Sequence, residues 1–107
     1  EQNQNRSSKI NEYAGMSFTD LTNEIRKRFD LSDESTGVVI VGVDDNSPAA
    51  ERGIKPGDII QKVDQVDINT SKEILKLVDE AKNNNKSSIL FLIKRGLNAR
   101  FIALPIN

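Results

Sequence analysis

The stretch NSPAAERGIKPGDII, residues 46–60, concentrates more helix and turn signals than any other part of this chain. Ser47 can cap a helix, and Pro48 suits the first helical position, where a missing N–H costs nothing. Gly53 is placed to close that helix in the left-handed conformation. Residues 55–58 (KPGD) have proline and glycine where a type II turn needs them. The stretch therefore predicts a short helix and a tight turn, followed directly by an apolar strand.

Two strands and a helix are predicted upstream of this stretch. EYAGMSF (12–18) alternates loosely between apolar and polar residues, which predicts a short strand. LTNEIRKRFDL (21–31) predicts a short helix, because Thr22 can cap it and Ile25 lies four residues before Phe29 on one face. GVVIVGVDD (37–45) is rich in β-branched residues and predicts a buried strand.

Further strands and one long helix are predicted downstream. Thr70 and Glu73 have the spacing of a capping box, so a helix is expected from about residue 71. Strands are predicted by DIIQKVD (58–64), QVDI (65–68), SSILFLIKR (87–95) and ARFIALPI (99–106). Strands joined by short turns favour an antiparallel arrangement. The predicted fold is therefore α+β and mostly β: a partly open antiparallel barrel of about five strands, capped by one long and two short helices.

Composition limits the chemistry that this chain can perform. It has 107 residues with ordinary globular composition, and residues 1–11 carry a single aliphatic side chain, so a linker or tail (1–11) and one domain (12–107) are expected. The chain has neither histidine nor cysteine, so it can build neither a Ser-His-Asp triad nor a thiolate metal site. No catalytic residue, metal or cofactor is expected. A net charge of −1 argues against nucleic-acid binding, and neither a membrane span nor a signal peptide is expected.

Three stretches resemble a known family. NSPAAERGIKPGDIIQKVDQVDI (46–68) resembles the core signature of a PDZ domain, and the predicted order of elements resembles the circularly permuted form found in bacterial proteases. LTNEI (21–25) is similar to the Leu-Thr-Pro-Glu-Leu segment of HtrA/DegP-type periplasmic serine proteases, with Asn23 in place of the proline. The ending RFIALPI (100–106) resembles that of their second, C-terminal PDZ domain.

The resemblance implies a binding groove beside the segment 12–18. In PDZ domains an extended peptide adds to the edge of a strand next to the long helix. Backbone N–H groups of the preceding loop hold its terminal carboxylate. The residues that this implies for peptide binding are Tyr13, Ala14, Gly15, Met16, Ser17, Phe18, Ile74, Leu75 and Val78. Within this set, Gly15 allows close backbone approach, whereas Ala14 departs from the bulky aliphatic residue usual in the family. Replacing Gly15 with valine is expected to abolish peptide binding and leave the fold intact.

Alternatives exist for these residues. Met16, Phe18 and the helix stripe could be core instead of ligand contacts, because periodicity does not separate the two roles. Leu77 and Ala81 are expected in the core. Two functions follow from the resemblance. In one, the domain binds C-termini or extended segments of unfolded proteins and presents them to a linked periplasmic serine protease domain. In the other, it is an assembly module that contacts other subunits of a homo-oligomer.

Overall fold

The computed structural model describes residues 10–31 and 37–106 of the chain. These parts hold seven strands and three helices. In chain order they are β1 (Asn11–Tyr13), β2 (Met16–Asp20), α1 (Asn23–Arg28), β3 (Val38–Val43), α2 (Pro48–Glu51), β4 (Ile59–Val63), β5 (Val66–Asp67), α3 (Ser71–Asn83), β6 (Ser88–Arg95) and β7 (Asn98–Pro105). The fold is α+β with one long helix, as the sequence predicts.

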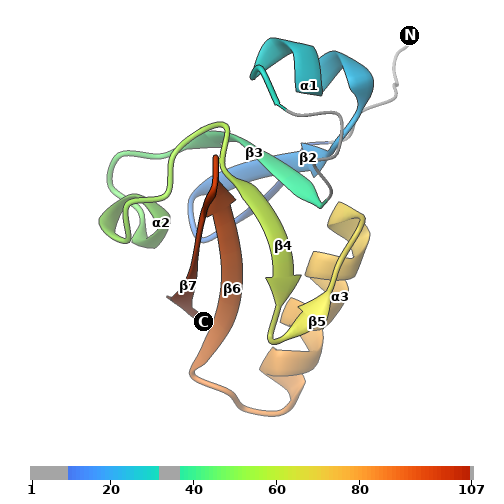
Figure 1. Ribbon diagram of the computed structural model, residues 1–107. Helices are drawn as coiled ribbons and strands as arrows, with labels where there is room; N and C mark the ends of the chain where they lie inside the picture. The colour runs from blue at the N-terminus through green and yellow to red at the C-terminus, as the bar shows by residue number, and fades with distance from the viewer. Residues whose placement is uncertain (1–9, 32–36, 107) are drawn as a thin grey trace, which may run out of the picture.

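Six strands form one continuous antiparallel path in the order β1-β2-β3-β4-β6-β7, and β5 pairs with β4 beside it. The longest pairing joins β6 to β7, which occupy most of the chain after α3. Figure 1 shows α3 packed along one side of this sheet, with α2 on the opposite side and α1 above the end of β2. The sheet is bent so that its end strands meet. The Tyr13 hydroxyl of β1 donates to the Pro105 carbonyl of β7 at 2.6 Å.

All three helices begin at the residues predicted from local chemistry. Thr22, Ser47 and Thr70 have extended backbones, and each side-chain oxygen accepts a hydrogen bond from a backbone N–H of the first helical turn. The capping box predicted at the start of α3 is present, since the Glu73 carboxylate accepts from the N–H of Thr70 at 3.0 Å. Hydrogen bonds from the backbone amides of Asn69 and Thr70 hold the pKa of the exposed Glu73 carboxyl below its ordinary value.

The turns around α2 also follow the prediction. Gly53 ends the helix with a φ of +82°, and Gly57 has a φ of +95° in the turn before β4. The N–H of Asp58 bonds the carbonyl of Lys55 at 3.1 Å, which closes the four-residue turn. The orderly stretch of residues 46–60 is therefore a structural frame.

The seven strands exceed the prediction of about five, in part because the predicted strand 12–18 contains a hairpin turn. Ala14 and Gly15 have φ values of +55° and +86° and divide the predicted strand 12–18 into β1 and β2. Asp64 and Gln65, with φ of +54° and +69°, separate β4 from β5 at the boundary predicted between the strands 58–64 and 65–68. Two successive positive φ values are typical of the two-residue turn that joins twisted antiparallel strands. The turn at Ala14-Gly15 lacks the Asn-Gly or Asp-Gly pair that would have revealed it in the sequence.

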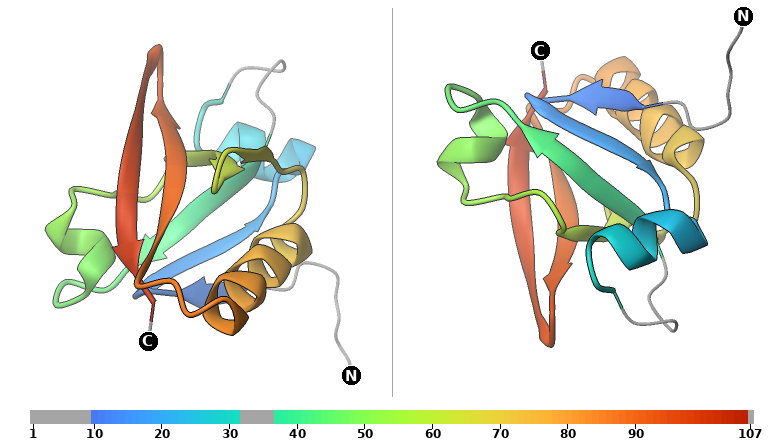
Figure 2. Two further views of the ribbon diagram at one scale, coloured as in Figure 1. Left: turned by 90° about the horizontal axis from the view of Figure 1, so that it is seen from below. Right: turned by 90° about the horizontal axis from the view of Figure 1, so that it is seen from above.

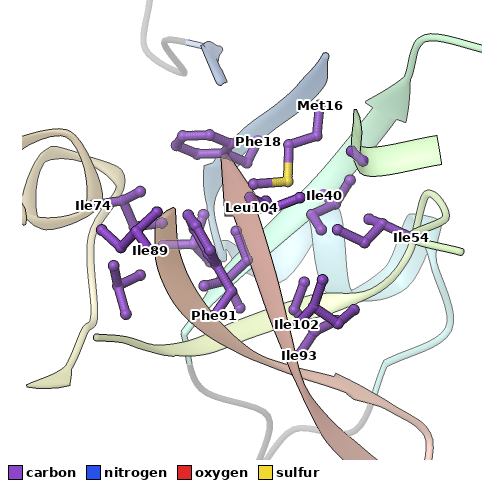
Figure 3. Packing of buried hydrophobic residues seen from close by; sticks show 14 of the residues in the cluster. Met16, Phe18, Ile40, Ile54, Ile74, Ile89, Phe91, Ile93, Ile102 and Leu104 are labelled. Atoms are coloured by element: carbon purple, nitrogen blue, oxygen red, sulfur yellow. The ribbon is translucent and has the colours of Figure 1, made fainter. Parts of the chain in front are cut away.

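One apolar cluster lies between the sheet and α3 (Figure 3). Its largest fully buried members include Phe18, Phe91, Met16, Ile40, Ile60, Ile74, Ile89 and Leu104. The helix contributes Ile74, Val78 and Ala81 from one face, three of the four residues (with Leu77) whose spacing predicts an apolar stripe. Leu77 is only half-buried and packs against the cluster, so the expectation that it belongs to the core was wrong.

An ion pair between a buried aspartate and a half-exposed arginine fixes the turn before β4 to the end of β6. The side chain of Asp58 is 2% exposed, and its two oxygens accept from Nε of Arg95 at 2.7 Å and from Nη2 at 2.8 Å. The same carboxylate accepts from the N–H of Lys55 at 3.0 Å. This hydrogen bonding to Asp58 raises the pKa of the Arg95 guanidinium, so the guanidinium remains charged.

Candidate functional site

The predicted peptide-binding segment forms a hairpin whose first strand covers one edge of β2. In the register of this pair, Asn11 lies opposite Phe18, Glu12 opposite Ser17 and Tyr13 opposite Met16. The other edge of β2 pairs with β3 along Met16–Asp20. Over its first three residues β2 therefore has a neighbouring strand on both sides.

Helix α3 runs alongside this hairpin. Both views in Figure 2 show β1 between β2 and α3. Asn11 Nδ2 donates to Oγ of Ser71, the first residue of α3, at 2.9 Å. The N–H of Ser71 in turn donates to Oδ1 of Asp20, the last residue of β2, at 2.7 Å. These two hydrogen bonds connect one end of β1, the start of α3 and the end of β2.

The apolar residues predicted to line the groove are brought together, but mainly as core. Met16, Phe18 and Ile74 have no exposed surface, and Val78 is 3% exposed. Figure 3 shows Phe18 and Ile74 pointing into the same apolar interior. Tyr13, Ala14 and Leu75 are partly buried and pack against this cluster, and Ser17 is half-buried. The buried residues thus form part of the core that β2 and α3 share.

Tyr13 is the most extensively anchored residue of β1. Its ring stacks on that of Phe91, with centroids 6.0 Å apart and an interplanar angle of 23°. Its hydroxyl donates to the Pro105 carbonyl. Burial raises the pKa of the Tyr13 phenol, because the phenolate would lose hydration. Asn11 and Tyr13 are half-buried while Glu12 is exposed, so β1 presents alternate side chains to the interior.

The turn between β1 and β2 is held tightly against α2. The carbonyl of Ala14 accepts from the N–H of Ala49 at 3.2 Å, and that of Gly15 accepts from the N–H of Asp44 at 2.8 Å. A Cβ at Gly15 would lie 2.0 Å from Cβ of Ser47. The close approach expected at Gly15 is present, but it is made to Ser47. The prediction that Gly15→Val leaves the fold intact was therefore wrong, since any side chain there displaces the N-cap of α2.

Three polar residues of this region were missed by the sequence prediction. Asn11 was assigned to the tail, and neither Asp20 nor Ser71 was given a role. Ser71 and Asp20 are 51 positions apart, and Asn11 and Ser71 are 60 apart. Local sequence patterns carry no signal for hydrogen bonds at such separations, so these contacts could be found only from the structure.

Other classes of site were sought in the described residues. Across 10–31 and 37–106, no three histidine, cysteine, aspartate or glutamate side chains group closely enough to hold a metal ion. None of the helices in the same ranges is both long and apolar enough to span a membrane.

Comparison with known proteins identifies the family. The family model described as "PDZ domain" matches residues 13–101. That match covers most of the chain and includes both β2 and α3. The chain belongs to the PDZ domain family.

The curated relatives place it beside one class of protease. The chain is 37% identical over 75 residues to a protein from Rhizobium meliloti named "Probable periplasmic serine endoprotease DegP-like". It is 34% identical over 92 residues to a protein of the same name from Rickettsia prowazekii. These matches cover 70% and 86% of this chain but only 15% and 17% of the relatives. The chain is thus a PDZ domain related to those of HtrA/DegP-type serine proteases, and it spans about a sixth of their length.

Solved structures share the fold. The HtrA3 PDZ domain, solved with the phage-derived ligand FGRWV, superposes with a TM-score of 0.67 at 25% identity, covering 92% of this chain and 88% of that one. The HtrA-type protease AlgW, solved with a decapeptide, gives a TM-score of 0.67 at 23% identity and covers 90% of this chain and 29% of its own. Both related structures were determined with a peptide.

Proposed function

We propose that this chain is the peptide-binding PDZ module of a periplasmic HtrA/DegP-type serine endoprotease. It binds C-termini or extended segments of unfolded proteins, which add as a strand to β2 beside α3. The observation that carries the proposal is the position of β1, an extended segment seated on this edge of β2 and in contact with the helix. The related HtrA3 domain and AlgW, each solved with a peptide, support it.

Backbone pairing gives such a site broad ligand tolerance. The edge of β2 supplies N–H and C=O groups that accept any extended peptide, whatever its side chains. The ligand's terminal carboxylate is assigned to the backbone N–H groups of residues 13–16. Its last side chain lies toward Met16, Phe18, Ile74, Leu75 and Val78. One buried side chain of leucine or phenylalanine size contributes about 1.5–3 kcal/mol. A dissociation constant in the range of about 1–100 μM is expected.

The remaining parts of the proposal concern the parent protein. Catalysis belongs to a separate protease domain, and the periplasmic location follows from the names of the curated relatives. The element order, with the β1–β2 hairpin first and the consecutive strands β6 and β7 last, supports the circularly permuted, partly open barrel. The closing sequence RFIALPI supports the second PDZ position and forms the end of β7.

A second function, assembly of protease subunits, is favoured by one observation. Strand β7 is the end strand of the sheet path opposite β1; it carries Phe101 at 56% exposure, and Leu97 in the turn before it is 97% exposed. An exposed strand edge with apolar side chains is suited to contact with another subunit. In that function the domain self-associates or binds its own protease domain, and free peptides bind weakly.

Fluorescence anisotropy with FGRWV separates the two functions. The labelled peptide is titrated as the free acid and as its C-terminal amide, and sedimentation of the domain is measured at about 1 mM, well above a micromolar dissociation constant. The peptide-binding proposal expects a monomer that binds the acid at least about tenfold more tightly than the amide. A self-associating domain that binds neither form would establish assembly instead.

A further inference from the structure

We propose that β1 is an internal ligand of the PDZ groove, and that outside peptides bind by displacing it. This inference rests on the proposed function, because it concerns the same edge of β2. Strand β1 runs antiparallel to β2 over three paired residues and lies between β2 and α3. A peptide that adds to β2 beside the helix needs the same backbone edge, so the two cannot be bound together.

The side chains of β1 make ligand-like contacts. Tyr13, at the loop end, stacks on Phe91, and Asn11, two residues earlier, donates to Ser71 at the start of α3. Glu12 between them faces outward and is exposed. Alternate side chains of β1 thus contact the groove while its backbone pairs with β2. The groove therefore prefers an aromatic residue at the loop end and a short polar residue two places before it.

The turn at Ala14 and Gly15 decides how firmly β1 is held. Both residues have positive φ, and only two residues connect the internal ligand to β2. A ligand tethered this closely has an effective concentration of about 1 mM or more. A free peptide present at micromolar concentration therefore competes with it at a disadvantage. Alanine tolerates a φ of +55° better than a β-branched residue, for which such a φ is a true outlier. The small residue at position 14 thus permits the closed hairpin.

Opposing substitutions at position 14 test the inference in the whole chain. Ala14→Ile disfavours the turn, whereas Ala14→Asn places Asn-Gly, the preferred pair for such a turn, in the sequence. The probe is a fluorescent copy of residues 9–13, Lys-Ile-Asn-Glu-Tyr, with a free C-terminal carboxylate. Relative to the unchanged chain, the isoleucine variant is expected to bind it roughly tenfold more tightly and the asparagine variant several-fold more weakly. The same peptide ending in serine should bind less well to every variant.

A second pair of variants acts away from the turn. Asn11→Ala removes the contact with Ser71, so the peptide should bind several-fold more tightly to it. Glu12→Gln changes an exposed side chain on the other face of β1 and serves as the matched control, with unchanged affinity. Amide hydrogen exchange of Met16 and Phe18, which pair with the two ends of β1, reports whether the strand is seated without peptide.

The outcomes separate the two proposals. Faster exchange together with tighter binding in Ala14→Ile and Asn11→Ala establishes β1 as the competing ligand. Equal affinity in all variants, with the peptide still bound at β2, would overturn the internal-ligand proposal and leave the proposed function standing. If no variant binds the peptide, the proposed function fails and the internal-ligand proposal fails with it.

Discussion

Replacing Gly15 with alanine should break the contact between the β1–β2 turn and the start of α2, and so destabilise the fold. The new Cβ would lie 2.0 Å from Cβ and 2.4 Å from Oγ of Ser47, whereas apolar carbons rest at about 3.5–4.0 Å. The φ of +86° adds a cost of about 1–2 kcal/mol for a residue with a side chain. Displacing Ser47 also removes its cap on the N–H of Ala50, worth about 1 kcal/mol. With overpacking of about 1–3 kcal/mol, the expected loss is about 3–6 kcal/mol.

Two further variants isolate the contact from the backbone angle. Gly96 also has a positive φ, of +59°, but a Cβ there has no neighbour within 4 Å, so Gly96→Ala should cost only about 1 kcal/mol. Ser47→Gly should lower the free energy of unfolding by about a few tenths of a kcal/mol, because glycine is a slightly weaker N-cap than serine. It also removes the side chain that the methyl group of Gly15→Ala would clash with. Combined with Gly15→Ala, it should recover about 2 kcal/mol.

Urea unfolding followed by far-ultraviolet circular dichroism is the suitable assay, because the chain has no tryptophan. The free energies of unfolding of the three single variants and the double variant form the comparison. Equal losses for Gly15→Ala and Gly96→Ala, or additive effects of the Gly15 and Ser47 changes within about 0.5 kcal/mol, would refute the reasoning.

Three further predictions concern other contacts. Arg95→Ala should lower the free energy of unfolding by about 2 kcal/mol, because Asp58 then stays buried without its cation; a loss below about 0.5 kcal/mol would contradict this. The Glu73 carboxylate has a lowered pKa, so its stabilisation is present above pH 4.5 and lost as pH falls through the folded pKa; Glu73→Gln should flatten the acid limb of stability against pH. The raised pKa of Tyr13 gives stability that is present below pH 10 and lost as pH rises through the folded pKa; Tyr13→Phe should abolish this alkaline loss at a cost of about 1 kcal/mol.

Local chemistry explains why much of the fold could be predicted from the sequence. Helix caps and turn glycines act within four residues, so local sequence patterns predict them. Examples are the caps at Thr22, Ser47 and Thr70 and the glycines at 53 and 57. The hairpin at Ala14 could not be predicted, because alanine is an unusual residue for a positive φ and the turn is held by hydrogen bonds from Ala49 of α2 to Ala14 and from Asp44 to Gly15.

The candidate site was predicted less completely than the fold. The apolar members could be named because Met16 and Phe18 alternate on a strand while Ile74 and Val78 repeat on a helix. Which of these residues belong to the core and which line the groove could not be predicted. A single apolar stripe on the helix can face both, and the burial of each residue depends on which element packs above it. The seating of β1 depends on Asn11 and Ser71, whose hydrogen bond spans 60 positions and has no local signature.

An NMR titration of the isotope-labelled chain with FGRWV, as the free acid and as its C-terminal amide, tests the central claim most directly. If β2 and α3 form the peptide site, the acid shifts the amide signals of residues 14–18 and 74–78 in a saturable way, and the amide form shifts them far less. Shifts confined to β7, or no shifts with either peptide, would contradict the account and indicate an assembly surface.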